Sequence, residues 1–139
     1  MNLKKCLLAA IAGLVAMFVL SFLWHKVLMS GIYQIDAGVY TNTWFKAEPD
    51  IRFILLAYVI LASVMSYLYP KGIEGDNKLM NGLRFGAVMG LLWVLPYQLV
   101  MHGITNITSL KTTGIDTIWH MVEEGIGGIV IAMVYGMGE

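Results

Sequence analysis

Four long apolar runs, separated by polar segments, dominate the chain. They cover approximately residues 5–29, 51–69, 82–102 and 115–137. Each is close to the ~20 residues with which an α-helix crosses the hydrocarbon core of a bilayer. The first run ends in Trp24-His25-Lys26, an aromatic and basic edge typical of a membrane interface. The pattern predicts an all-α integral membrane four-helix bundle, with residues 1–139 forming a single transmembrane domain.

The polar segments predict the topology. Residues 30–50 mix aromatic and charged side chains, so they are expected to form an outer loop on the membrane surface. Orientation follows the distribution of Lys and Arg. One side carries Lys4, Lys5, Lys71, Lys78 and Arg84, and the other carries Lys26, Lys46, Arg52 and Lys111. The first set is the denser on short segments, which favours both termini on the cytoplasmic side of a bacterial inner membrane.

Composition agrees with a membrane protein and excludes other classes. The chain is 58% hydrophobic and 13% charged, whereas soluble domains are about 45–50% apolar and about 25% charged. The net charge of zero leaves no basic footprint for nucleic acid. Cys6 is the only cysteine, so an intramolecular disulfide is impossible. The apolar run after Lys5 is longer than the ~7–15 residues of a signal peptide, which predicts a retained first span.

Small residues recur at four-residue intervals in the third and fourth runs. Such spacing lets helix backbones approach closely. The candidate packing residues are Gly82, Gly86, Gly90, Gly128, Ala132 and Gly136. They predict close helix contacts and, where glycine faces remain exposed, a homo-oligomer in the lipid bilayer.

Ionisable residues inside the fourth run are the strongest indication of function. His120, Glu123 and Glu124 lie within it, and a charged group in a membrane span is costly unless it is paired, protonated or facing a cavity. His120 and Glu124 are four residues apart and share a helix face. Glu123 lies about a hundred degrees round the helix from Glu124. It is therefore expected to face elsewhere: a subunit interface, the outer loop or Arg52.

Histidines of two other runs are expected to approach this pair. In an antiparallel bundle His25, His102 and the start of the fourth span fall on the same, outer side, and helical side chains lean toward the N-terminus of their helix. The sequence thus predicts an outer polar pocket between the first, third and fourth spans. Its binding or proton-carrying residues are Glu124, His120, Glu123 and Gln98, and its candidate metal ligands are His120, Glu124, His25 and His102.

Several functions remain open for this pocket. Imidazole with carboxylate suits zinc, iron, copper or manganese, and a carboxylate near histidines suits proton exchange in transport. The pocket would bind a cation, a proton or a small polar ligand for transport or sensing. The alternatives are a membrane-embedded metal- or haem-dependent enzyme, with zinc or another transition metal favoured over haem, and an accessory subunit without chemistry. No catalytic residue is identified.

The segment Leu23-Trp24-His25-Lys26-Val27-Leu28-Met29-Ser30-Gly31 resembles the Leu-Trp-Tyr-x-x-Leu-x-x-Gly turn of an uncharacterised family of small four-span bacterial membrane proteins, a domain of unknown function. The order and spacing of the spans are similar over most of the chain. His25 stands where that family usually has Tyr, and Val27 where Pro is common. The resemblance implies a four-helix membrane fold and no particular activity.

Overall fold

The computed structural model describes residues 2–28, 49–72, 77–105 and 109–137. Its helices are α1 (Leu3–Phe22), which continues into a π-helical segment (Leu23–Leu28), α3 (Ile51–Leu68), which ends in a 3-10 turn (Tyr69–Lys71), α4 (Lys78–Ile104) and α5 (Leu110–Gly136). These ranges contain no strand, and four helices are long and apolar enough to cross a membrane. The predicted all-α, four-span fold is confirmed. The expected outer loop over 30–50 lies outside the described residues except for Pro49 and Asp50.

Two helices begin earlier than their apolar runs. α5 starts at Leu110 rather than at Ile115, because Ser109 caps it: the Ser109 Oγ accepts a hydrogen bond from the backbone N–H of Thr112 at 3.1 Å. The predicted fourth run, from residue 115, therefore begins inside the helix. α4 likewise starts at Lys78, where Asn77 accepts from the backbone N–H of Met80. Capping side chains, not hydrophobicity, determine both starts.

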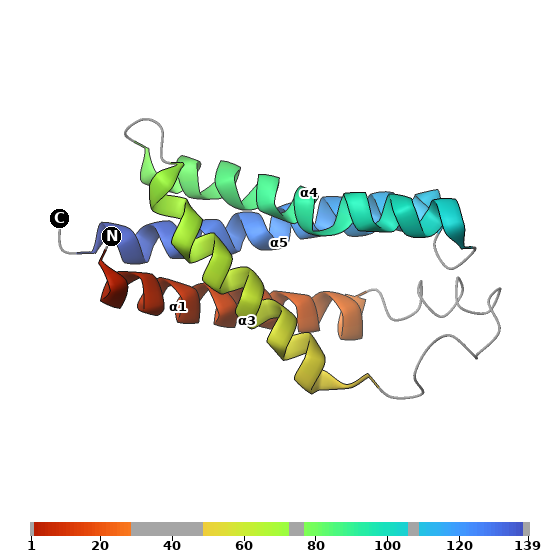
Figure 1. Cartoon of the computed structure of the whole chain (residues 1–139), viewed down its shortest axis with the longest axis horizontal. Helices are drawn as coiled ribbons and strands as arrows, with labels where there is room; N and C mark the ends of the chain where they lie inside the picture. The colour runs from red at the N-terminus through yellow and green to blue at the C-terminus, as the bar shows by residue number, and fades with distance from the viewer. Residues whose placement is uncertain (1, 29–48, 73–76, 106–108, 138–139) are drawn as a thin grey trace.

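The helix α5 lies at the centre of the bundle. Half of its most apolar window is buried, against 11–28% for the other helices. α4 packs along one side of α5 and α1 along another, while α3 crosses α1 at a steep angle (Figure 1). The Lys5 Nζ donates to the backbone oxygen of Tyr135 at 3.1 Å, so α1 begins where α5 ends. We call this the proximal end, and the end where α5 begins the distal end.

The contact between α4 and α5 depends on glycine. A Cβ at Gly82 would lie 2.5 Å from the backbone oxygen of Gly128. A Cβ at Gly86 would overlap the backbone oxygen of Glu124, and one at Gly90 would overlap that of His120. All three are shorter than real side-chain contacts, so the two backbones touch along this line. The glycine line therefore fixes the stretch of α5 that carries the ionisable residues.

Apolar side chains fill the proximal half of the bundle. Met17, Met65 and Ile131 are fully buried there, from three different helices. Ser66, also fully buried, donates to the backbone oxygen of Cys6 at 2.7 Å, which ties α3 to α1. This packed half supports the polar cluster, which lies on α5 between Ile131 and the distal end.

Candidate functional site

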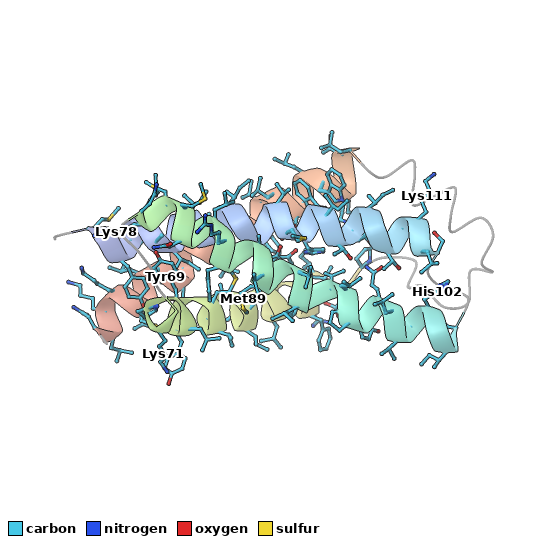
Figure 2. The ribbon with its side chains drawn as sticks, turned by 90° about the horizontal axis from the view of Figure 1, so that it is seen from above. Tyr69, Lys71, Lys78, Met89, His102 and Lys111 are labelled. Carbon is cyan, nitrogen blue, oxygen red and sulfur yellow. The ribbon has the colours of Figure 1, made fainter. Side chains whose placement is uncertain are left out.

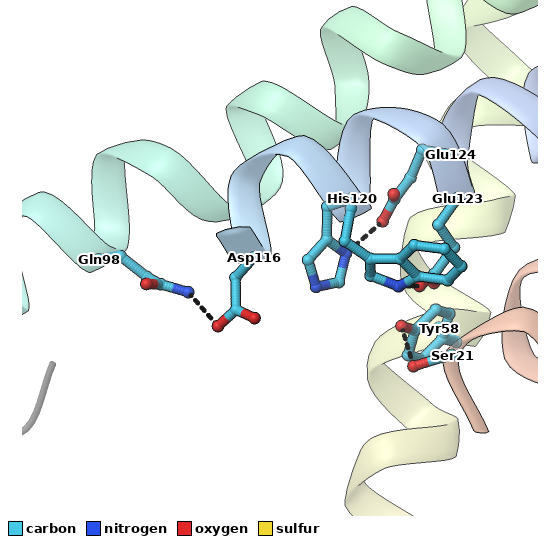
Figure 3. Close-up of polar contacts among 8 residues, drawn as sticks. Ser21, Tyr58, Gln98, Asp116, His120, Glu123 and Glu124 are labelled. Atoms are coloured by element: carbon cyan, nitrogen blue, oxygen red, sulfur yellow. Dashed lines mark hydrogen bonds and ion pairs between the residues drawn. The ribbon is translucent and has the colours of Figure 1, made fainter. Parts of the chain in front are cut away.

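Three ionisable residues of α5 form one buried cluster. His120, Glu123 and Glu124 each place a possible ligand atom within 4.8 Å of the others. The His120 Nδ1 and the Glu124 Oε1 are 3.0 Å apart (Figure 3). Glu123 and Glu124 have no solvent exposure, and His120 is 8% exposed. The cluster is thus a polar site enclosed by helices.

The expectation that Glu123 points away from the cluster was wrong. Glu123 and Glu124 are about a hundred degrees apart on the helix, but His120 lies between them. Positions three and four residues along a helix both neighbour the first one. Since α5 is enclosed by the other helices, its buried arc is wide enough to hold all three side chains. The spacing His-x-x-Glu-Glu was therefore the signal for the whole cluster.

Glu123 also does not pair with Arg52. Arg52 lies at the start of α3 and forms an ion pair with Asp50 at 2.9 Å. The hydrogen bonds from Arg52 hold the pKa of the Asp50 carboxyl below its usual range. That pair caps α3 on its exposed side, away from the cluster.

Glu123 is held by aromatic side chains. The Trp119 Nε1 donates to the Glu123 Oε2 at 2.7 Å. The Tyr58 hydroxyl of α3 lies beside the Glu123 carboxylate and donates to the Ser21 Oγ of α1 at 2.7 Å (Figure 3). Four polar residues from three helices thus form one chain. Sequence reasoning missed both hydroxyl groups, because Ser21 of α1 and Tyr58 of α3 meet beside Glu123 only where α3 crosses α1.

The cluster leaves two carboxylate oxygens unsatisfied. The Glu123 Oε1 and the Glu124 Oε2 are buried and accept no hydrogen bond from the described residues. Apart from His120, no basic side chain of the described residues compensates these carboxylates: every described Lys and Arg is exposed except Lys5, which is half-buried at the proximal end. A buried carboxylate without a partner is costly. Both oxygens are therefore open to a proton or a cation.

The distal part of α1 contacts the same stretch of α5. Two successive residues of the π-helical segment meet two successive residues of α5. The Trp24 ring stacks on Trp119, with centroids 4.1 Å apart and planes within 2°. The His25 ring lies 6.2 Å from that of His120. π-Helical turns occur frequently at functional sites, where the wider turn redirects side chains.

The remaining predicted residues lie further toward the distal end. The Gln98 Nε2 donates to the Asp116 Oδ2 at 3.1 Å, one turn from His120 (Figure 3). His102 is exposed in the last turn of α4 (Figure 2). Gly90, which touches His120, is twelve residues from His102, or about 18 Å along the helix. The structure thus brings His25 to His120 but leaves His102 apart from the cluster.

The cluster lies at a different position along each helix. Glu123 is the middle residue of α5, with thirteen residues on either side between Leu110 and Gly136. Gly90, at the level of His120, is likewise near the middle of α4. The residues of the first span that face the cluster lie in its distal third: Ser21 in α1, and Trp24 and His25 in the π-helical segment. The site is therefore buried well inside the bundle and closer to the distal end of α1.

A family model described as a predicted membrane protein (DUF2177) matches residues 6–133. The chain belongs to this family. Its function is unknown, which agrees with the uncharacterised four-span family that the first span resembles. No curated protein and no solved structure matches the chain. The DUF2177 match establishes a membrane protein and assigns it no activity.

Proposed function

We propose that the protein binds a divalent transition-metal cation at His120, Glu123 and Glu124. The observation that carries this proposal is the pair of buried, unsatisfied oxygens, Glu123 Oε1 and Glu124 Oε2, beside the His120 ring. A bound cation would satisfy both oxygens and neutralise both carboxylates. Because no described Lys or Arg is buried with them, a cation or protons must supply that charge.

The donor set suits a first-row metal. Imidazole favours zinc, iron and copper, and carboxylates also suit manganese. Ligand atoms around zinc lie about 3.3 Å apart, given zinc–ligand bonds of about 2.0–2.2 Å. The three ligand atoms here lie within 4.8 Å of one another, so they would move together by about 1.5 Å at most on binding. Three protein ligands would leave a coordination position for water or another side chain.

The position of the site supports a role in transport or sensing. Polar sites of secondary transporters lie deep between membrane helices, where access alternates between the two sides. Glu123 is central in α5, and α5 is the most buried helix. A membrane-embedded metal enzyme would use the same ligands and is the alternative to transport or sensing.

Proton exchange is a second candidate, supported by one contact. The His120 Nδ1 and the Glu124 Oε1 share a hydrogen bond at 3.0 Å in a buried setting. A histidine and carboxylate so arranged can share and release a proton. The two functions are compatible, because metal ligands must lose protons when the cation binds.

Equilibrium dialysis of the purified, chelator-treated protein against zinc, followed by elemental analysis, tests the metal proposal. We expect about one zinc per chain, with Glu123→Gln and Glu124→Gln each weakening binding by tenfold or more, as loss of a ligand charge implies. Asp50→Asn, which removes the charge of a carboxylate outside the cluster, is the matched control. Wild-type protein that takes up no zinc, or glutamine variants that bind like wild type, would refute it.

A further inference from the structure

A pocket of about 240 Å³ opens between α1 and the start of α3. Its wall is largely apolar and includes Phe18, Phe22 and Ile54. Its polar lining includes Ser21, His25 and Lys26. The pocket lies beside the buried cluster, and none of the three cluster residues lines it.

The pocket meets the cluster at two points. Ser21 lines the pocket and accepts the hydrogen bond of Tyr58, whose hydroxyl lies beside Glu123 (Figure 3). One pair of hydroxyl groups thus separates the pocket from the carboxylate. At the second point His25 lines the pocket while its ring approaches that of His120 at 6.2 Å.

We infer that this pocket is the entrance of the cation site, with the Ser21–Tyr58 pair as its gate and His25 as the first ligand that an entering cation meets. This inference rests on the proposed cation binding. The hydroxyl pair is suited to a gate because rotation of two hydroxyl-bearing side chains opens it without moving a helix. His25 offers an imidazole between the pocket and His120, so a cation can exchange its waters for protein ligands stepwise.

Blocking an entrance and removing a ligand have different effects on cation binding. A plug in the entrance raises the barrier for entry and for exit equally, so both rates fall while the equilibrium affinity stays the same. Loss of a ligand changes the affinity itself. Kinetic measurements therefore separate the two roles.

Two neighbouring residues of α3 provide a matched pair of variants. Ile54 lines the pocket and is 39% exposed, whereas Leu55 does not line it and is 42% exposed. Ile54 is also one helical turn from Tyr58 and shares its face. Ile54→Trp should fill the entrance, and Leu55→Trp adds the same ring on another face of the same helix.

The experiment follows Co²⁺ binding to the full-length protein by stopped-flow tryptophan fluorescence. Bound Co²⁺ should quench Trp119, which is hydrogen-bonded to Glu123. Ile54→Trp should slow association and dissociation by about tenfold each, with an unchanged equilibrium constant, and Leu55→Trp should slow neither. Ser21→Ala should accelerate both rates, because it releases the Tyr58 hydroxyl. Lys26→Gln should accelerate association, because it removes a positive charge from the path of the cation.

A measurement without the cation distinguishes the two proposals. In a Cys6→Ser background, Ser21→Cys should react with a small polar thiol reagent, and adding Ile54→Trp should slow that reaction by about tenfold while Leu55→Trp does not. If Co²⁺ fails to bind wild type, the proposed function falls. If Co²⁺ binds but Ile54→Trp leaves both its rates and the labelling of position 21 unchanged, the entrance is overturned alone.

Discussion

Gly86 of α4 lies directly against the backbone carbonyl of Glu124, so close that a Cβ at position 86 would overlap that oxygen. The helix contact and the polar site therefore share the same atoms. Whatever moves α4 away from α5 also moves a carboxylate of the cluster.

Gly86→Ala should destabilise the protein strongly. A methyl group at this position has no space against the backbone of α5, and overpacking costs about 1–3 kcal/mol or more. Thermal unfolding in detergent, followed by circular dichroism, measures the change. Gly103→Ala is the control, because a Cβ there meets nothing within 4 Å. It should be neutral or slightly stabilising, and equal melting temperatures for the two variants would contradict the close contact.

Trp119→Phe should also destabilise the protein, through Glu123. The change keeps an aromatic ring against Trp24 but removes the N–H that donates to the Glu123 Oε2 at 2.7 Å. A hydrogen bond to a charged group is worth about 1.5–3 kcal/mol, and its loss leaves another buried oxygen without a partner. Trp93→Phe, at a tryptophan 39% exposed on α4, serves as the control. Chemical unfolding curves that coincide for both variants would show that the Trp119 bond contributes nothing.

The three histidines should differ in their effects on zinc binding. His120→Ala removes a ligand and should abolish binding at micromolar zinc. His25→Ala should slow association with little change in affinity, since its ring lies 6.2 Å from that of His120. His102→Ala should change neither the association rate nor the affinity, because His102 is exposed at the distal end of α4. Isothermal titration together with stopped-flow kinetics measures both quantities. A loss of affinity in the His102 variant would contradict the geometry.

Cation affinity should rise with pH. Metal binding requires a neutral imidazole and ionised carboxylates, so protons compete with the cation and are released when it binds. At low pH the cluster holds its protons, so cation affinity is weak. Cation affinity strengthens as the pH rises and the protons are lost. Titration in buffers of different ionisation enthalpy counts the released protons. An affinity independent of pH, with no protons released, would argue against these ligands.

The sequence predicted the helices well and the site in part. Long apolar runs identified the four spans, and the four-residue spacing of Gly82, Gly86 and Gly90 indicated the line along which α4 meets α5. Hydrophobicity could not locate the start of α5, because its first turns are polar and Ser109 sets the boundary by capping.

Side-chain partners from other helices were less accessible to sequence reasoning. Helical spacing predicted the pair His120 and Glu124. Glu123 was misplaced, because its angular position was compared with that of Glu124 instead of that of His120. Tyr58 and Ser21 meet only because α3 crosses α1, and the distance of His102 from the cluster depends on how far α4 extends. Such facts depend on crossing angles and helix lengths, which no local pattern encodes.

X-ray absorption at the zinc edge of the zinc-loaded protein identifies the ligands of the cation themselves. We expect one imidazole nitrogen and carboxylate oxygens at about 2.0–2.2 Å, with the imidazole signal lost in His120→Ala. The Cys6 sulfur should be absent from the zinc shell, because Cys6 lies in the proximal half beside Ser66. A shell containing sulfur at about 2.3 Å, or a spectrum unchanged by Glu123→Gln and Glu124→Gln, would contradict the account.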